Sequence, residues 1–150
     1  TCNFPSYAAG NVELTSFLVK GAQMPASIIS PIMIPFRGRQ LQIAGDRTFE
    51  PWSITVINDV DFSVRGAFER WMNGINNHNN NTGLSNPTDY QADMIVEQLN
   101  KAVEVTKKYD IRGTFPTNVS AIDLSYDSEN QIEEFTVELQ VQYWESGTTS

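Results

Sequence analysis

The sequence predicts a mainly β protein: a single-domain β-barrel or β-sandwich with one flanking α-helix at about residues 62–75. Three observations support this class. The chain has 150 residues, a length at which one domain buries enough surface to be stable. Most of the chain alternates apolar and polar residues with the period of two that is typical of strands. A single segment has the helical period instead. We therefore treat residues 1–150 as one domain.

The first third of the chain predicts strands and a hairpin. Residues 12–18 begin the alternating pattern. The apolar run 26–34 contains Pro31, which cannot donate to a ladder, so an edge strand or an irregular strand is expected there. Alternating residues on both sides of Ala44-Gly45-Asp46 predict a long hairpin over residues 37–58 with its turn at 44–46.

The predicted helix lies in the middle of the chain. Its apolar residues share one stripe of an amphipathic helix, and they are Val64, Phe68, Trp71, Met72 and Ile75. Asp61 is the expected N-cap, and Gly74 or the asparagines after it are expected to end the helix. The polar residues 76–90, rich in asparagine, predict a mobile surface loop.

The C-terminal half predicts three more strands. One covers residues 103–111 and ends at Gly113 and Pro116. Residues 122–126 and 135–143 are expected to pair as a hairpin around the polar turn 127–130. The predicted inward face of the last strand consists of Phe135, Val137, Leu139, Val141 and Tyr143.

Composition excludes several function classes. Eighteen acidic and ten basic residues give a net charge of −8, which disfavours a nucleic-acid-binding role because such binding depends on clustered cations. One cysteine and one histidine are too few for a disulfide framework or a zinc site. No apolar run approaches the roughly 20 residues of a membrane span.

No catalytic motif is present, so neither enzymatic activity nor a cofactor or metal is expected. The sequence has no G-x-S-x-G, glycine-rich phosphate loop, H-E-x-x-H or C-x-x-C. A Cys2–His78 pair would have to join a chain terminus to the asparagine-rich segment. A carboxylate pair for glycoside hydrolysis stays possible among eighteen acids, but no pattern singles one out.

The three tryptophans raise a different possibility, a carbohydrate-binding β-sandwich. Trp71 falls on the apolar stripe of the helix and Trp52 on the apolar side of a strand, so we expect both in the core. Trp144 follows Tyr143 on the opposite side of the strand and could cover the domain or contact a neighbouring molecule.

Several motifs in the same order resemble one protein family. They are Q-L-Q-I-A-G-D-R-T-F at 40–49, Trp52 with a strand ending at Asn58-Asp59, G-T-F-P-T-N-V at 113–119, an acidic turn near Asp127, and Tyr143-Trp144-Glu145. This set resembles the major tail tube proteins of contractile-tailed (myovirus) bacteriophages. The similarity extends over most of the chain after about Met24.

The resemblance implies a structural role and a set of partners. Subunits of that family form stacked hexameric rings, in which long hairpins join into one barrel around a lumen that conducts DNA into the host without binding it specifically. Expected partners are further copies of the chain, the sheath, the baseplate or tube initiator, the tape measure protein and the tail terminator. The location would be the virion tail, after assembly in the host cytoplasm. The alternative is a baseplate initiator or terminator of the same fold.

The resemblance also suggests functional residues. Expected ring or subunit contacts are Arg37, Arg39, Asp46, Arg47 and Trp144. A set of polar strand residues is expected to face either the lumen or the outer wall exposed to the sheath, with at least some facing the lumen: Glu104, Thr106, Glu138, Gln140 and Gln142. Because DNA must pass without being trapped, we expect a net acidic or neutral lumen, with Arg37, Arg39, Arg47 and Arg112 engaged in subunit contacts.

Overall fold

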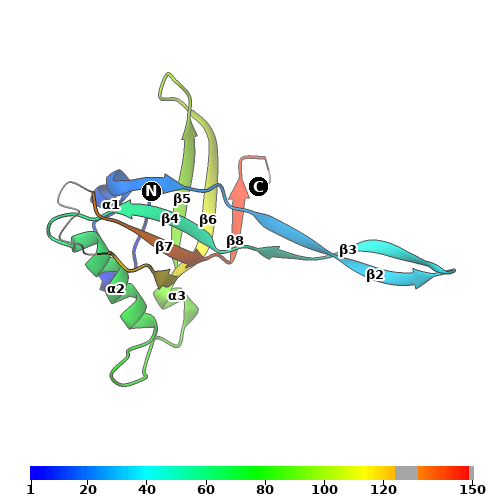
Figure 1. Ribbon diagram of the computed structural model, residues 1–150, viewed down its shortest axis with the longest axis horizontal. Helices are drawn as coiled ribbons and strands as arrows, with labels where there is room; N and C mark the ends of the chain where they lie inside the picture. The colour runs from blue at the N-terminus through cyan, green and yellow to red at the C-terminus, as the bar shows by residue number, and fades with distance from the viewer. Residues whose placement is uncertain (124–131, 149–150) are drawn as a thin grey trace.

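The computed structural model describes residues 1–123 and 132–148. One curled antiparallel sheet has the strand order β1-β4-β7-β6-β5, and β8 also pairs with β6 (Figure 1). Its strands are β1 (Val19–Ala22), β4 (Trp52–Ile57), β5 (Ala92–Leu99), β6 (Val105–Val119), β7 (Glu134–Gln140) and β8 (Tyr143–Ser146). The helices are η1 (Ser6–Ala8), α1 (Val12–Leu18), α2 (Ser63–Ile75) and α3 (Pro87–Tyr90). The predicted mainly β class is confirmed.

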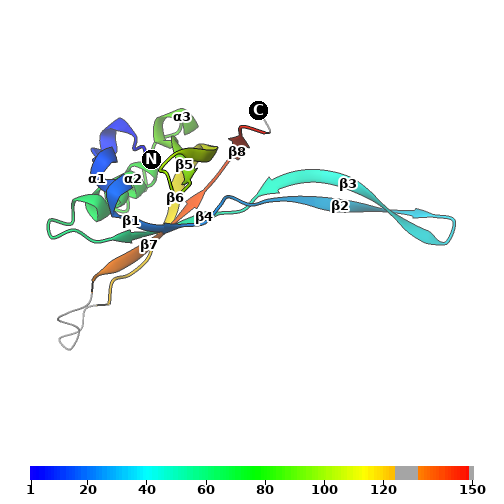
Figure 2. The same ribbon diagram turned by 90° about the horizontal axis from the view of Figure 1, so that it is seen from above.

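The core lies between the curled sheet and α2. Alternate residues of β4 and β7 point into it, so Ile54 and Val56 are buried beside Val137 and Phe135, their partners in the ladder. Phe68 of α2 contacts Phe135 edge to face, with ring centroids 6.4 Å apart. Figure 2 shows α1, α2 and α3 on the same side of the sheet. The predicted burial of Trp52 and Trp71 and the predicted helix over about 62–75 are confirmed.

Residues 12–18 form a helix, so the strand predicted there is wrong. Asn11 is the N-cap, and its side-chain oxygen accepts a hydrogen bond from the Leu14 amide at 3.0 Å. This bond satisfies one of the free donors of a helix start. A seven-residue segment gives too little sequence to distinguish a period of 2 from 3.6, and here the cap decides the conformation.

The start of α2 also differs from the prediction. Phe62, rather than Asp61, occupies the N-cap position, with a left-handed φ of 55° and no side-chain cap. A turn closed by the Phe62 amide and the Asp59 carbonyl, 3.1 Å apart, leads into the helix. The Ser63 hydroxyl donates to the Asp59 carboxylate. The end of α2 at the C-cap Asn76 agrees with the sequence.

Four elements were absent from the sequence prediction: η1, β1, α3 and β5. Part of the predicted loop 76–90 is helical, because α3 occupies 87–90 and Asn86 caps it by accepting from the Thr88 amide. The mobility of that loop stays a prediction. Strand β5 follows, and only Met94 among its residues is fully buried, so the strand lacks a repeated apolar face.

Strand β6 is longer than predicted and does not end at Gly113 or Pro116. Gly113 has a φ of 62° and bends the strand. Before this bend β6 pairs with β5 and β8, and beyond Thr114 it pairs with β7. Pro116 stays in register opposite Leu139. Val103 precedes the strand, in the turn that joins β5 to β6.

The predicted strand 135–143 is two strands. The apolar residues of this alternating segment are buried as far as Val141. Tyr143 is 46% exposed, because the chain turns at 141–142 and β8 pairs with β6. Residues 124–130 of the predicted hairpin lie outside the described residues. Within the described part, residues 121–123 are not a strand, and β6 itself pairs antiparallel with β7, as Val119 opposite Val137 shows.

We expect Gly113→Ala to destabilise the body of the protein. A Cβ there would lie 2.7 Å from Cγ of Gln142, and the left-handed φ is unfavourable for alanine. The expected cost is about 1–3 kcal/mol, or several degrees in Tm, measured by calorimetry. Gly21→Ala, whose Cβ would meet nothing within 4 Å, is the control. An equal Tm for both variants would contradict the role of Gly113 as a bend.

Candidate assembly surface

Strands β2 (Ser27–Phe36) and β3 (Arg39–Phe49) form a separate two-stranded sheet that extends away from the body (Figure 1). Among the described residues, neither strand pairs with any other. The turn consists of Arg37 and Gly38, with φ of 47° and 77°. Positive φ at both central residues is the type I′ geometry preferred in tight hairpins. The hairpin predicted over 37–58 with a turn at 44–46 is therefore wrong.

Gly45 and Asp46 form a bulge in the middle of β3. The register changes there, since Ile29 lies opposite Arg47 while Pro31 lies opposite Ala44. A Cβ on Gly45 would overlap the Ser30 carbonyl oxygen. Glycine is thus needed for close approach of the two strands rather than for a turn. The signal that could have located the turn is Arg37-Gly38 between two alternating apolar runs.

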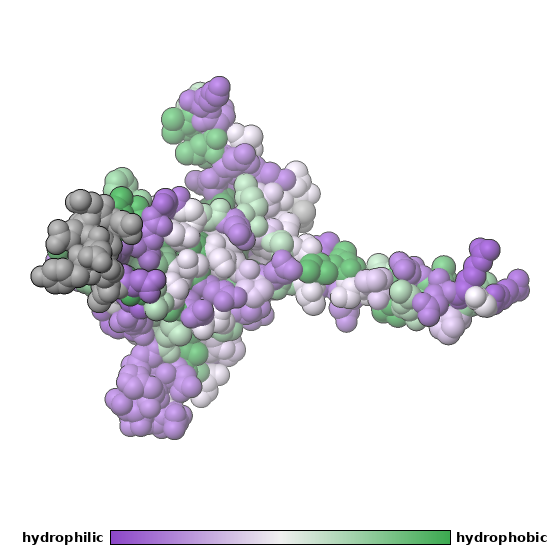
Figure 3. All heavy atoms as spheres, in the orientation of Figure 1, coloured by the Kyte–Doolittle hydropathy of each residue, from purple (hydrophilic) through white to green (hydrophobic). Residues whose placement is uncertain are grey.

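One face of the hairpin is apolar and uncovered. The ladder places six large apolar residues on it: Ile28, Ile32, Ile34, Phe36, Leu41 and Ile43. Their exposed fractions range from 42% for Ile34 to 59% for Phe36. Figure 3 shows hydrophobic residues along the hairpin and hydrophilic ones at its tip. Contiguous exposed apolar surface of this kind marks an interaction site.

The hairpin also differs from the body in charge. It contains Arg37, Arg39, Arg47 and a single acid, Asp46, for a net charge of +2. Because the whole chain carries −8, the remainder carries −10. The guanidinium of Arg37 lies over the Phe36 ring, 5.3 Å from its centroid. The surface that the sequence analysis did not identify is therefore the apolar face of the β2–β3 hairpin, with basic residues at the turn of the hairpin.

The five expected contact residues do not lie together. Arg37 and Arg39 are at the tip of the hairpin, while Asp46 is in the bulge of β3 and Arg47 follows it, opposite Ile29. Trp144 lies in β8 and packs on the root of the hairpin, where its ring contacts Phe49 with centroids 6.2 Å apart. Their roles as subunit contacts stay predictions.

The five expected lumen residues lie on three parts of the body. Glu104 is in the β5–β6 turn, where its carboxylate accepts a hydrogen bond from Asn100, and Thr106 follows at the exposed start of β6. Glu138 and Gln140 share the half-buried face of β7. Gln142 is exposed between β7 and β8. Their orientation toward a lumen stays a prediction.

The β5–β6 turn is a second exposed apolar surface. Leu99, Val103 and Val105 are 52%, 74% and 53% exposed. Val103 has a φ of 61°, which is rare and unfavourable for a β-branched residue. The Asn100 side-chain oxygen holds the turn by accepting from the amides of Ala102 and Glu104 at 2.8 and 3.0 Å. We call these three apolar residues the ribbon tip.

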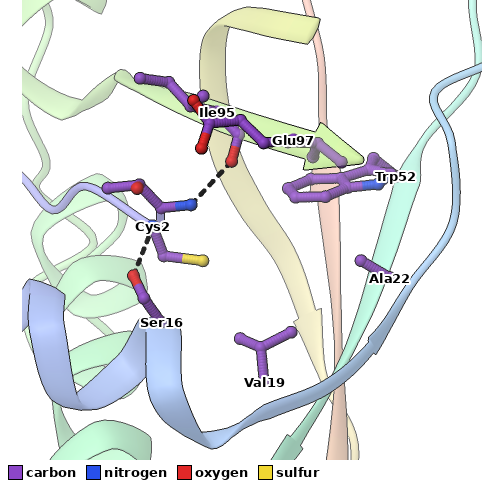
Figure 4. A pocket seen from close by; sticks show the side chains of 9 residues that line it. Cys2, Ser16, Val19, Ala22, Trp52, Ile95 and Glu97 are labelled. Carbon is purple, nitrogen blue, oxygen red and sulfur yellow. Dashed lines mark hydrogen bonds between the residues drawn. The ribbon is translucent and has the colours of Figure 1, made fainter. Parts of the chain in front are cut away.

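A cavity of about 170 Å³ lies between the N-terminal segment, β1 and β5 (Figure 4). Cys2, Ser16, Trp52 and Glu97 are among the residues that line it. Burial raises the pKa of the Cys2 thiol, which disfavours the reactive thiolate. His78 does not line the cavity and is exposed in the loop after α2. The two residues of the Cys–His pair considered above therefore do not meet.

Residues 1–123 and 132–148 contain no cluster of histidine, cysteine, aspartate and glutamate suited to a metal. Over the same residues, no helix has the length and apolar character needed to cross a bilayer. Arg112 is paired within the chain, because the Asp93 carboxylate accepts from its guanidinium at 2.8 Å and raises its pKa.

Solved structures of the anti-feeding prophage and of an extracellular contractile injection system contain chains that share this fold. The solved structure of the anti-feeding prophage tube-terminating cap has a TM-score of 0.64 and 18% identity, covering all of this chain and 93% of that one. The 6-fold symmetrised baseplate of the same prophage has a TM-score of 0.62 and 13% identity, covering 85% and 79%. A sheath–tube complex of the extracellular system PVC has a TM-score of 0.58 and 14% identity, with the same coverage.

Sequence comparison is more specific. A family model described as phage tail tube protein matches residues 5–146. The tail tube protein gp19 of Enterobacteria phage T4 is 37% identical over 131 residues, covering 87% of this chain and 80% of its own length. The tail tube protein of Serratia phage KSP90 is 31% identical over 141 residues, covering 93% and 80%. The chain belongs to the phage tail tube protein family and is a structural tail tube subunit, as the sequence motifs predicted.

We expect Gly45→Ala to disturb the hairpin while sparing the body. The added methyl must displace the Ser30 carbonyl, whereas no ladder links β2 or β3 to the other described strands. Amides of residues 27–49 should lose protection from hydrogen exchange by about tenfold or more, with the Tm of the body shifted by less than about 1 °C. Gly147→Ala, with open space around its Cβ, is the control. Unchanged protection of residues 27–49 would show that the bulge tolerates a side chain.

Proposed function

We propose that this subunit assembles into stacked hexameric rings, and that the β2–β3 hairpin of each copy joins its neighbours to close a continuous barrel around a lumen. The uncovered apolar face of the hairpin is the observation that supports this most strongly. Six large apolar side chains on one ribbon gain burial only if another surface covers them. A neighbouring copy supplies such a surface at every position of a ring.

The free edges of the hairpin support the same arrangement. Unpaired strand edges accept additional strands, and a closed barrel leaves no edge exposed. In the described residues, the outer edges of β2 and β3 have no partner. The sixfold order follows from the family resemblance and agrees with the 6-fold symmetrised baseplate that shares the fold.

The ribbon tip supports a second type of contact, between rings. Leu99, Val103 and Val105 project away from the body on the β5–β6 ribbon, separate from the hairpin (Figure 1). A subunit with two distinct apolar surfaces can bind one neighbour within a ring and another in the next ring. Val103 holds an unfavourable backbone conformation in an exposed position, which is typical of a functional contact.

The tube would conduct DNA through an acidic or neutral lumen. The net charge of −10 outside the hairpin repels a polyanion, so DNA would pass without being held. In this proposal the hairpin arginines are engaged with neighbouring copies, and the polar residues of β6 and β7 supply lumen candidates. Arg112, already paired with Asp93, adds no free cation to such a lumen.

The other partners follow from the family. The sheath, the baseplate or tube initiator, the tape measure protein and the tail terminator would contact the tube in the virion tail, after assembly in the host cytoplasm. The matched sheath–tube complex and tube-terminating cap support the sheath and terminator as partners. The protein would act as a structural element without catalysis, as the names of its relatives suggest.

We expect Ile34→Glu to prevent assembly without unfolding the subunit. The carboxylate would enter the apolar interface, where an unpaired charge is strongly unfavourable, whereas in the free subunit this side chain is 42% exposed. Gln42→Glu adds the same charge on the other face of the hairpin and is the control. Electron microscopy and analytical ultracentrifugation should show rings and tubes for the control and monomers for Ile34→Glu.

Assembly of Ile34→Glu into normal tubes would contradict burial of the apolar face. If the parent protein stays monomeric at high concentration, even when seeded with an initiator complex, the proposed assembly into a tube is contradicted. A parent that forms single rings without extension would instead support the terminator alternative.

We expect Val103→Gly to weaken stacking while leaving the fold intact or slightly more stable. Glycine adopts a φ of 61° without strain but removes the apolar side chain from the ribbon tip. Loss of a buried valine at about 1.5–3 kcal/mol raises the critical concentration for tube growth about tenfold or more. Ala102→Gly is the control in the same turn. An unchanged critical concentration for Val103→Gly would exclude the ribbon tip from stacking.

A further inference from the structure

We infer that Trp52 and Trp144 are positioning residues that hold the β2–β3 hairpin in the direction required for contact with a neighbouring copy. This inference rests on the proposed tube assembly. It assigns a role to two tryptophans that lie in the sequence motifs but outside the expected apolar contact face. The role depends on their indole N–H groups and their rings at the root of the hairpin.

The hairpin needs such a device because its connections to the body are short and irregular. Residues 23–26 join β1 to β2 and residues 50–51 join β3 to β4, and neither segment is a strand. Within the described chain, no ladder links the hairpin to the body sheet. A two-stranded ribbon held only by two linkers could swing relative to the core.

Trp52 fixes the beginning of the incoming linker. Its ring is 3% exposed and lies between β4 and the cavity near Cys2, as Figure 4 shows. Its Nε1 donates to the Gln23 carbonyl oxygen at 2.6 Å. Because the ring is immobilised in the core, this hydrogen bond ties Gln23 to the rigid part of the molecule.

Trp144 fixes the end of the same linker. Its Nε1 donates to the Ala26 carbonyl oxygen at 3.3 Å. Its ring contacts Phe49, the last residue of the outgoing strand, and Tyr109 of β6, with centroids 6.2 and 5.5 Å apart. One side chain of the body thus contacts both the linker that enters β2 and the last residue of β3.

Two attachment points define a direction, whereas one defines only a pivot. Gln23 and Ala26 are three residues apart, and each is held by an indole from a different strand of the body. The Phe49 contact prevents rotation about the line that joins them. Phenylalanine would preserve the ring packing at either site but would lack the donor.

The direction of the hairpin can be measured in the monomer. Cysteines introduced by Arg39→Cys at the hairpin tip and Glu69→Cys on the exposed side of α2 carry a pair of spin labels; native Cys2, 4% exposed, is protected by burial. The background variant Ile34→Glu keeps the subunit monomeric, so that neighbours do not orient the hairpin. Pulsed electron paramagnetic resonance then gives the distribution of distances between the labels.

The test variants are Trp52→Phe, Trp144→Phe and their combination. Trp71→Phe is the matched control, because its Nε1 donates to the Tyr90 carbonyl at 2.6 Å in the core, away from the hairpin. We expect the distance distribution to become at least about twice as broad in the double variant and to stay narrow in the control. The control should lower Tm without changing the distribution.

Assembly is measured separately, with Ile34 restored and the label sites native. If the hairpin has the correct direction about a tenth of the time, apparent affinity falls about tenfold, so the critical concentration of the double variant should rise by that factor. If the double variant does not fold, Trp144→Phe alone, with its partly exposed ring, is the variant compared.

Four results are decisive. An unchanged distribution in the Trp variants would overturn the inference, and so would a broadened distribution with unchanged assembly. If the parent forms no tubes while the distribution broadens, the proposed function fails but the tryptophan contacts still orient the hairpin. Broadening together with a raised critical concentration supports both.

Discussion

The uncovered apolar face of the β2–β3 hairpin distinguishes this subunit from a self-contained domain. An isolated two-stranded hairpin is marginally stable in water, and this one has no covering layer among the described residues. Its order in the free subunit comes from the I′ turn at Arg37-Gly38, the close approach at Gly45 and the tryptophan contacts at its root. In the proposed tube, other copies of the chain supply the remaining stabilisation.

The body is built to be independent of that hairpin. Its core joins β4 and β7 to α2 through contacts such as Phe68–Phe135, and none of the fully buried side chains belongs to β2 or β3. A subunit built this way can fold first and assemble later, because the core contains no residue of the hairpin. In the projecting parts, Val103 has a left-handed backbone conformation and the large apolar side chains of the hairpin are exposed.

The sequence predicted the elements whose periodicity is long and buried on one side, as at Ile54, Val56, Val137 and Leu139. It failed where one local contact decides the conformation. Asn11 turns an apparently alternating segment into a helix, and the Ser30 carbonyl turns Gly45 from a turn residue into a bulge. The apolar hairpin face was hidden because strand pairing, not spacing, determines which residues of β2 and β3 share a side.

Charge influences which surfaces of two subunits come into contact. The part of each subunit outside the hairpin has a net charge of −10, so these parts of two subunits repel one another. Salt screens this repulsion beyond roughly 8 Å. An acidic body attracts the basic hairpin, so charge favours contact between a hairpin and a body over contact between two bodies. Apolar burial acts only at contact and then fixes the register. Long-range repulsion and short-range burial together favour an ordered ring over random aggregation, which an exposed apolar ribbon would otherwise promote.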